Sequence, residues 1–389
     1  MASFRIALLA GLKRPIALDT TVSRNRIIAD LAVGLSRKGH DVTIFGTADS
    51  NLPGIKFIPV VETGLNFYKL TENPFYTETA YITHAITEFI KYQNQFDLLH
   101  NHMYPEFLPL LALSSINVPV VTTIHGQITD ELRMALSDTM GTSSLISISK
   151  SARERLKLPA QVVYNGIDTS FYTPIDNPKK DYVLFVGRMS KAKKDGKFID
   201  PKGVANAIKV SQGSGVPLKI VGNVEDRKFY DELVIPNLSD KIEVMGGISS
   251  EQSLTREQMR DLYENAMAFL FPINWEEPFG LVMAEAMACG TPVVAYNRGS
   301  VSEIVRDGVT GFIIDRDDED RPGKGTWIIK KKGVEGLVEA VRRIEEIDRK
   351  VCRKHVEDNF SVDRMIEGYE SVYNEILSKN RGLTPKLNP

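Results

Sequence analysis

Hydrophobic and polar positions follow a repeating order along this chain. Short runs of apolar, β-branched residues alternate with longer segments whose apolar residues recur at helical spacing. This alternation is typical of parallel sheets with crossover helices, so we predict an α/β protein. A helix over 27–38 is expected to end at Gly39. The strands predicted for the first half are 5–10, 41–46, 55–60, 97–102, 118–124, 145–149 and 161–164.

A break in this pattern separates two halves of the chain. The stretch 173–180 holds two prolines and lacks apolar periodicity, so it is expected to be a linker. Because 389 residues exceed what one core usually serves, we predict two doubly wound domains, 1–175 and 176–360. Two such sheets predict a ligand-binding cleft beyond the carboxyl ends of the strands. The second set of strands is 182–186, 218–221, 242–245, 268–273, 292–296 and 312–314.

Composition and charge narrow the class of function. The 42% hydrophobic and 25% charged contents are those of a soluble globular protein, and a net charge of -2 argues against a general nucleic-acid binder. The two cysteines, Cys289 and Cys352, are too few for a disulfide framework, which favours reduced thiols in the cytoplasm. The apolar start over 4–15 is expected to be a strand rather than a signal peptide or a membrane span, so any membrane contact would be peripheral.

The most informative polar residues lie in the stretch 272–303. Between Leu281 and Cys289 only Glu285 is polar, so this helix is expected to be covered all round and its carboxylate to need hydrogen-bond donors. Glu277 precedes the helix, where free N–H groups favour an anion. A sugar nucleotide has hydroxyls for both glutamates and a phosphate for the helix start. The alternative is that Glu285 meets an arginine or a backbone amide in the core and that Glu277 is an ordinary helix-start acid.

Several motifs carry a resemblance to a known family. They are EEPFG at 276–280, EAMACGTPVVA at 285–295, Gly187-Arg188, Lys202-Gly203, Gly308 with TGF at 310–312, KGHDVTIF at 38–45, TIHG at 123–126 and NGID at 165–168. With these motifs the chain resembles the retaining glycosyltransferases of family 4, and they cover most of it in the family's order. The resemblance implies the GT-B fold, in which two Rossmann-like domains face a cleft. It also implies that the amphipathic helix at 361–380 packs back on the N-terminal domain, which would take the acceptor.

The resemblance implies a role for each matching residue. Arg188 and Lys202 would hold the donor diphosphate, where negative charge develops as it leaves. Glu285 would bind the ribose hydroxyls, and His125 would lie near the anomeric carbon. The implied catalytic residues are His125, Glu277, Arg188 and Lys202, and the implied donor-binding residues are Arg188, Lys202, Glu277, Phe279, Gly280, Leu281, Glu285 and Gly11. Without the resemblance, the two cations would be ordinary solvated loop residues and His125 a structural histidine.

The same resemblance implies front-face transfer with retention, without an enzyme nucleophile, a divalent metal or a cofactor. His100 and His102 are expected on one side of a strand, but two ligands are too few for a metal site. The sequence departs from the family pattern at 22–25, where paired glycines are usual. The lysine-rich stretch 190–201 is expected to be a solvated surface loop, with contact to an anionic acceptor or lipid as the alternative, and 316–332 an exposed insertion.

We therefore predict transfer of a hexose from a nucleotide sugar, with UDP-glucose favoured, to a hydroxyl of a glycan, lipid or small molecule. A nicotinamide dehydrogenase is disfavoured because no G-x-G-x-x-G follows a strand; the nearest match, 213–215, precedes one. Two alternatives stay open: a sugar-nucleotide epimerase of similar fold, and a binding protein without activity. The second predicts loss of the charged motif residues, which are all present.

Overall fold

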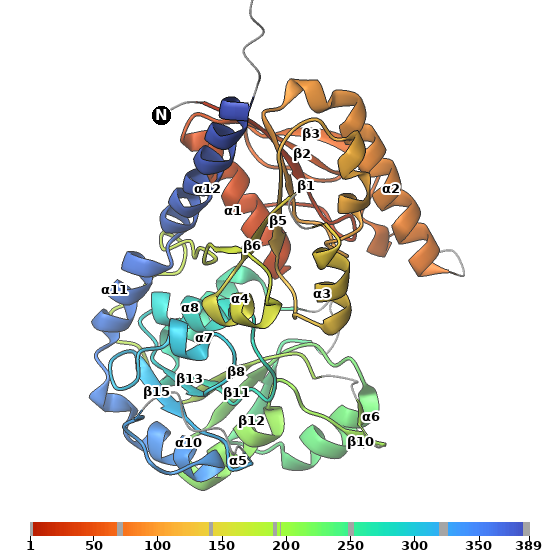
Figure 1. Cartoon of the computed structure of the whole chain (residues 1–389). Coiled ribbons are helices and arrows are strands. Elements are labelled where there is room, and N and C mark those ends of the chain that lie inside the picture. The colour runs from red at the N-terminus through yellow and green to blue at the C-terminus, as the bar shows by residue number, and fades with distance from the viewer. Residues whose placement is uncertain are drawn as a thin grey trace, which may run out of the picture. The chain divides into compact units, whose positions relative to one another are not determined.

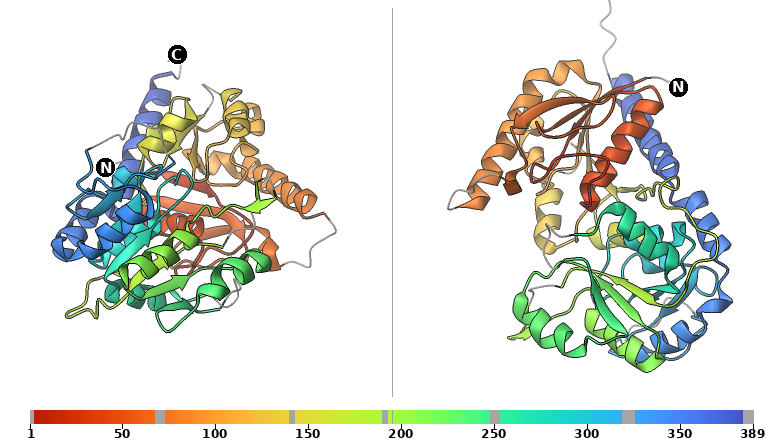
Figure 2. Two further views of the ribbon diagram at one scale, coloured as in Figure 1. Left: turned by 90° about the horizontal axis from the view of Figure 1, so that it is seen from below. Right: turned by 180° about the vertical axis from the view of Figure 1, so that it is seen from behind.

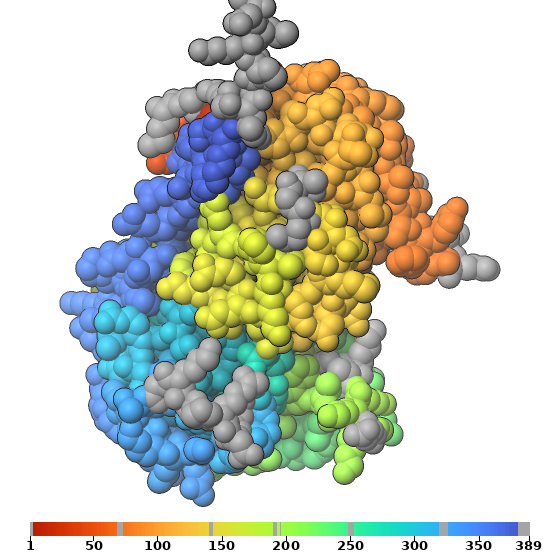
Figure 3. Space-filling view, in the orientation of Figure 1, coloured from red at the N-terminus to blue at the C-terminus, as the bar shows by residue number. Residues whose placement is uncertain are grey.

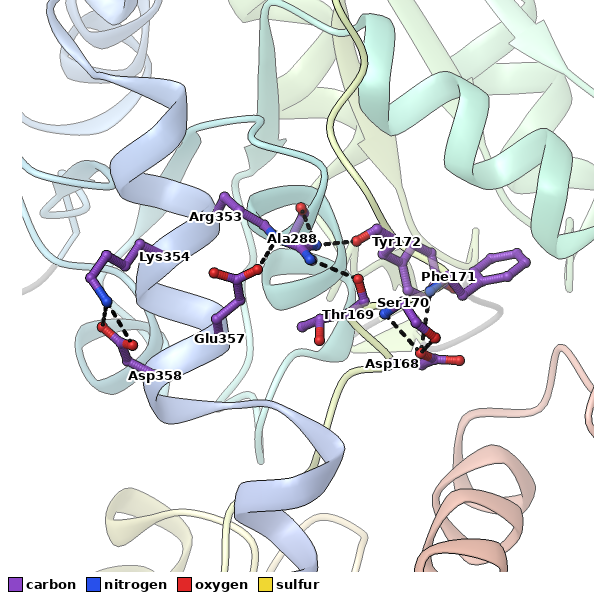
Figure 4. A network of polar contacts seen from close by, with 10 residues as sticks. All are labelled: Asp168, Thr169, Ser170, Phe171, Tyr172, Ala288, Arg353, Lys354, Glu357 and Asp358. Atoms are coloured by element: carbon purple, nitrogen blue, oxygen red, sulfur yellow. Dashed lines mark hydrogen bonds and ion pairs between the residues drawn. The ribbon is translucent and has the colours of Figure 1, made fainter.

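The computed structural model describes residues 3–67, 73–139, 143–189, 193–194, 196–247, 253–318 and 326–383. The chain forms two compact units, of which the first comprises Met1–Gly166 with Val362–Pro389 and the second Ile167–Ser361. The boundary between the first and second units lies after Gly166, before the predicted linker at 173–180. The reason is that residues 167–172 bind the end of the second unit: Ile167 N–H donates to Phe360 O at 2.7 Å, and Arg353 donates to the carbonyls of Thr169 and Tyr172 (Figure 4).

The first unit is built on one parallel sheet in the order β3-β2-β1-β4-β5-β6-β7. All of its predicted strands are present, with ends shifted by at most two residues. The buried strands β1 and β4 lie in the middle, which explains their continuous apolar runs. The strands are β1 (Arg5–Leu9), β2 (Asp41–Thr47), β3 (Lys56–Val61), β4 (Leu98–Asn101), β5 (Val120–Ile124), β6 (Ser144–Ser147) and β7 (Gln161–Val162).

Helices cover both faces of this sheet. On one face, α2 (Pro74–Tyr92) packs Ile82 and Phe89 into a core that includes Phe45 and Leu99. On the other, α1 (Ser23–Arg37) lies beside the last helix, α12 (Val362–Leu383), as Figures 1 and 2 show. The shorter helices α3 (Asp130–Ser137) and α4 (Lys150–Leu156) follow β5 and β6.

The helix α12 is amphipathic, as its sequence predicts. Its buried side chains are Met365, Ile366, Tyr369, Val372, Tyr373 and Leu377. Its opposite side is exposed and forms the dark blue surface in the upper part of Figure 3. A buried pair, His40 Nε2 and Glu370 Oε1 at 3.1 Å, adds a polar contact between α12 and the start of β2. The last helix is therefore part of the core of the first unit.

The second unit repeats the architecture with a parallel sheet in the order β12-β11-β8-β13-β14-β15. Its six predicted strands are confirmed: β8 (Val183–Val186), β11 (Leu218–Val221), β12 (Ile242–Met245), β13 (Ala268–Phe271), β14 (Val293–Tyr296) and β15 (Gly311–Ile314). The helices are α5 (Val204–Ser214), α6 (Arg227–Phe229), α7 (Arg256–Asn265), α8 (Leu281–Ala288), α9 (Val301–Ile304), α10 (Gly333–Arg342) and α11 (Arg349–Asn359).

The two unusual insertions behave differently. Within 190–201, β9 (Lys193–Lys194) and β10 (Lys197–Phe198) form an antiparallel hairpin with exposed lysines, while 190–192 and 195 lie outside the described residues. Within 316–332, residues 319–325 lie outside them too. The described part of this second stretch corrects the expectation of full exposure, because Ile329 is buried and Trp327 Nε1 donates to Asp315 at 3.0 Å. Ile329 is therefore buried in the second unit although it lies in a charged stretch of the sequence.

Candidate functional site

A lysine, a glutamate and a tryptophan form a compact cluster in the second unit. Lys202 Nζ donates to Glu277 Oε2 at 2.9 Å, and Trp275 Nε1 donates to the same oxygen at 2.9 Å. The ammonium also lies 4.3 Å from the centroid of the Trp275 ring, within cation–π range. The side chains of Lys202 and Glu277 are only 18% and 12% exposed, so this ion pair is mostly withdrawn from water. The structure thus joins two predicted site residues and adds one that sequence analysis missed.

The loop that carries Lys202 is fixed by its neighbours. Asp200 Oδ1 and Oδ2 accept the backbone N–H groups of Gly203 and Ala205, each at 2.8 Å, and so satisfy the start of α5. Burial raises the pKa of the Asp200 carboxyl. Asn274 binds the same loop from the far end of β13, because its side chain donates to Asp200 O at 2.6 Å and its N–H to Pro201 O at 2.8 Å. Lys202 and Glu277 are therefore held together by backbone contacts as well as by their charges.

A second polar set shapes the turn that leads into α8. Glu276 accepts Arg298 Nη1 at 3.0 Å and the N–H of Gly299 at 2.9 Å. Ser300 binds the backbone of the same turn: its N–H donates to Glu277 O at 3.0 Å and its hydroxyl to Phe279 O at 2.7 Å. The adjacent glutamates thus have separate tasks: Glu276 holds the loop after β14, and Glu277 faces Lys202.

The helix α8 begins after Gly280, which has φ 85° and offers no capping side chain. The first N–H groups of the helix, near the predicted donor contacts Phe279, Gly280 and Leu281, favour an anion there. At the opposite end of α8, the carbonyl oxygen of Ala288 accepts a hydrogen bond from Arg353 of α11 at 3.0 Å (Figure 4). A cation is favourable at this end of a helix. The helix is thereby anchored at its end while its start adjoins Glu277.

Glu285 is buried in α8, as predicted, with 4% of its surface exposed. Its Oε2 accepts a hydrogen bond from the hydroxyl of Tyr263 on α7 at 3.0 Å. A tyrosine hydroxyl, which sequence analysis did not name, is therefore one donor to this carboxylate. Binding of ribose hydroxyls by Glu285 stays a prediction.

The structure describes the surroundings of Arg188 and Gly11, while their contacts with a donor stay predictions. The Arg188 side chain is 62% exposed and pairs with Glu225 at 2.8 Å. Its neighbour Gly187 adjoins Lys202, because a Cβ added there would lie 2.8 Å from Lys202 Cβ. A Cβ added at Gly11 would meet no atom within 4 Å, so packing does not require a glycine there. Residues 22–25 start α1 instead of forming a glycine loop.

In the first unit His125 ends a line of three histidines. It follows β5, and its Nε2 is 2.8 Å from His102 Nδ1. His102 Nε2 is 3.2 Å from His100 Nδ1, and that nitrogen is 2.7 Å from the hydroxyl of Tyr373 on α12. His100, in β4, and His102, just after it, lie on the same side of the strand, as predicted. The hydrogen-bonded line links the last helix of the chain to the predicted catalytic histidine.

These histidines are neutral at physiological pH. Burial lowers the pKa of His102 to about 3, and it lowers the pKa of His100 well below its usual value. The pKa of His125 is also well below its usual value, first because of burial and then because a proton on His125 would be repelled by a proton on His102 and by the charge of Arg24. Among the residues that the structure describes, no group of three or more side chains is arranged to hold a metal ion.

The buried histidines predict acid sensitivity. Between pH 6.5 and the folded pKa of about 3 for His102, the unfolded chain binds more protons, so the free energy of unfolding falls as the pH falls, by about 1.4 kcal/mol per pH unit for each such group. Urea unfolding of His102→Asn from pH 7 to pH 4.5 should show a shallower loss than the unsubstituted protein. His84→Asn, at an exposed position on α2, should keep the original slope. Equal slopes in all three proteins would contradict a buried neutral His102.

Two family models match the chain in sequence. The model described as Glycosyltransferase Family 4 matches residues 25–171, and the one described as Glycosyl transferases group 1 matches residues 171–324. The chain belongs to the family 4 glycosyltransferases. The second match contains Lys202, Trp275, Glu277 and Glu285, and the first contains the three histidines.

Curated relatives of this glycosyltransferase align along most of its length. The spore coat protein SA of Bacillus subtilis is 25% identical over 416 aligned positions, covering 97% of this chain and 100% of that protein. The D-inositol 3-phosphate glycosyltransferase of Mycolicibacterium smegmatis is 25% identical, covering 81% of this chain and 80% of that protein.

Solved structures show that the glycosyltransferase has the GT-B fold. A sucrose-phosphate synthase from Thermosynechococcus elongatus matches with a TM-score of 0.74 at 19% identity, covering 97% of this chain and 100% of that one. Anabaena Alr3699/HepE in complex with UDP and glucose matches with a TM-score of 0.68 at 16% identity, covering 96% of this chain and 100% of that one. In the described part of this chain no helix has the length and apolar character needed to cross a membrane.

Proposed function

We propose that this glycosyltransferase moves a hexose from a nucleotide sugar to a hydroxyl acceptor, with retention at the anomeric carbon and without a metal ion. The observation that carries the proposal is the partly buried Lys202–Glu277 pair, with Trp275, next to the start of α8. Two segments of the chain thus bring together a cation, a carboxylate and the first N–H groups of a helix. A sugar diphosphate has the complementary groups.

The reaction requires charge stabilisation at the leaving group. The bond between the anomeric carbon and the β-phosphate oxygen breaks, the acceptor oxygen bonds to the same face of that carbon, and its proton passes to the departing phosphate. As that bond breaks, negative charge builds up on the β-phosphate oxygen before the proton reaches it, and the Lys202 ammonium and the N–H groups at the start of α8 would stabilise this charge. An ammonium has three donors, so Lys202 can bind Glu277 and a phosphate oxygen together.

The sugar itself would be held by Glu277 and the neighbouring backbone. A carboxylate accepts hydroxyl hydrogens and fixes the orientation of the ring, and Trp275 restricts the position of that carboxylate. His125, neutral because of its lowered pKa, would contact the reacting sugar from the first unit. We favour UDP-glucose as donor, which the UDP and glucose bound by Alr3699/HepE support.

Ligand-dependent melting tests the proposal. The purified protein would be heated with UDP-, GDP- and ADP-sugars, with and without EDTA, and one nucleotide sugar should raise the melting temperature equally under both conditions. Mass spectrometry and NMR of products with candidate acceptors should then show a hexose added in the anomeric configuration of the donor. Stabilisation by none of the donors would overturn the proposal, isomerised donor without transfer would indicate an epimerase, and binding without any turnover would indicate a binding protein.

Glu285 gives a separate prediction about nucleotide affinity. Glu285→Ala should weaken binding of the nucleoside diphosphate by about tenfold or more, because a hydrogen bond to a charged group contributes about 1.5–3 kcal/mol. Calorimetric titration measures this directly. Tyr263→Phe serves as the matched control, since it removes the hydroxyl that donates to Glu285 Oε2 but keeps the carboxylate. Equal affinity in Glu285→Ala and the unsubstituted protein would exclude contact with the ribose.

A further inference from the structure

A buried carboxylate in the first unit lacks a hydrogen-bond partner at one oxygen. Glu106 is 3% exposed, and its Oε1 has no hydrogen-bond donor in the structure. Burial raises the pKa of this carboxyl. The backbone of the same residue is well fixed, because Asn101 Nδ2 donates to Glu106 O at 2.8 Å. A buried acceptor left without a donor is unfavourable, and a ligand that donates to this oxygen would remove that cost.

The nearest charge is a guanidinium that stands too far away for a hydrogen bond. Arg24 Nη2 lies 3.8 Å from Glu106 Oε1, whereas a charge-assisted hydrogen bond requires about 2.7–2.9 Å. The Arg24 side chain is 23% exposed, and its guanidinium lies 5.2 Å from the centroid of the Tyr104 ring. Arg24 thus lies over the Tyr104 ring and beside the carboxylate, partly exposed and without a hydrogen bond to Glu106 Oε1.

The position of this pair connects it with the predicted catalytic histidine. A Cβ added at Gly126 would lie 3.7 Å from Glu106 Oε1, so the carboxylate adjoins the backbone directly after His125. The charge of Arg24 contributes to the lowered pKa of both His102 and His125. Arg24 comes from the start of α1 and Glu106 from the loop after β4, so both lie where the parallel strands end.

From these contacts we infer that Glu106 and Arg24 bind a hydroxyl group of a neutral polyhydroxyl acceptor beside His125. The inference rests on the proposed function and names the acceptor class for it. A single oxygen about 2.8 Å from each of the two atoms completes the contact: its hydrogen is donated to Glu106 Oε1 and its lone pair accepts from Arg24. A hydroxyl group provides both functions in one atom.

Charged ligands fit the pair less well. A phosphate placed against Arg24 would meet the Glu106 carboxylate a few ångströms away, and a cation placed against Glu106 would meet Arg24. A neutral hydroxyl avoids both repulsions and supplies the donor that Oε1 lacks. A polyol fits this position because a second hydroxyl can reach His125, whose neutral ring can donate or accept.

Binding of defined polyols to the full-length protein tests the inference. D-glucose, myo-inositol and sucrose would be titrated by saturation-transfer NMR, with inorganic phosphate in a separate titration. Each titration would be run with and without the nucleoside diphosphate that stabilises the protein most. We expect at least one polyol to bind and Glu106→Gln to weaken it tenfold or more, while nucleotide affinity stays unchanged. Glu62→Gln, at an exposed position of the same unit, is the matched control.

Steady-state kinetics add a readout that a purely structural role would not give. Glu106→Gln should raise the KM for the acceptor tenfold or more and leave the KM for the donor unchanged. If Glu106→Gln fails to fold, Arg24→Lys should produce the same separation, because a lysine keeps the charge but loses the stacked fork that faces Glu106.

Several results would overturn the inference. These are no polyol binding, unchanged affinity in Glu106→Gln and Arg24→Lys, binding of phosphate alone, or a crystal structure with only a water molecule between the two side chains at saturating polyol. The proposed function fails by a different result, namely no stabilisation by any nucleotide sugar. If no nucleotide sugar stabilised the protein, polyol binding that depends on Glu106 would still show that this pair binds a polyol.

Discussion

Gly203→Ala is expected to destabilise the second unit by about 2–5 kcal/mol and to weaken nucleotide binding. The residue has φ 86°, and a Cβ there would lie 1.9 Å from Pro272 O. The left-handed conformation costs about 1–2 kcal/mol for alanine, and relief of overpacking about 1–3 kcal/mol more. Any shift that relieves the clash displaces Lys202 relative to Glu277. Urea unfolding and nucleotide titration of the same sample measure both effects.

The opposite end of the same helix supplies a matched control. Gly215 ends α5 with φ 80°, and a Cβ added there meets no atom within 4 Å. Gly215→Ala should therefore show only the conformational cost of about 1–2 kcal/mol and unchanged nucleotide affinity. Equal losses in the two variants would mean that the approach of Gly203 to Pro272 contributes nothing.

Lys202→Met is expected to lower kcat by about 100- to 1000-fold, the loss typical of removing one donor that stabilises a transition-state charge. Methionine keeps the length and much of the apolar stem, so the packing against Trp275 is largely retained. The removed ammonium also leaves the Glu277 carboxylate with fewer donors, which adds to the loss. Rates with the best donor and acceptor pair, measured at saturating concentrations of both, report the effect on kcat.

A second lysine with similar local contacts controls for lost packing and charge. Lys219 on β11 lies over the Tyr182 ring at 4.2 Å and is 3.8 Å from Glu243. Lys219→Met should keep full activity, because neither partner belongs to the proposed donor site. A Lys202→Met enzyme that retained its kcat would remove Lys202 from the catalytic residues.

The sheets of this protein were predictable because their strands are buried on both faces. Runs such as 268–273 and 292–296 are almost wholly apolar, and turn residues bound them, so period and length identify them as central parallel strands. The ends were less certain: β13 ends at Phe271 instead of 273. The prediction of an exposed insertion over 316–332 was wrong at Ile329, because a single buried side chain is hard to recognise within a run of charges.

The site was predictable only where a motif is local. The spacing of Glu277 and Glu285 marks both residues, and the apolar setting of α8 explains the burial of Glu285. The contact of Lys202 with Glu277 joins positions 75 residues apart; the family resemblance assigned both residues to the donor but did not predict that they touch. Trp275 directly precedes the EEPFG motif, which was a signal that could have been used. Tyr263, Arg24 and Glu106 come from other elements, and no local pattern marks them.

Other expectations stay predictions. They include the donor-bound arrangement of His125, the contact of Gly11 with phosphate, the cleft, and the identity of the donor base and sugar. Arg188 pairs with Glu225 through Nη1, so its predicted contact with a diphosphate would use its other N–H donors or would require this exposed ion pair to open. Exposed pairs contribute about 0–1 kcal/mol, a cost that a phosphate contact can offset.

The first unit can be completed only late in synthesis, because part of its core comes from α12. Its sheet is complete at Val162, yet Tyr369, Tyr373 and Glu370, which cover His100, Thr123 and His40, are translated only after the whole second unit. A ribosome that stops before position 362 would thus release a first unit with an open apolar side, a target for chaperones and proteases. The first unit therefore depends on residues 362–383, so a chain that ends between 166 and 362 lacks part of the core of its N-terminal half.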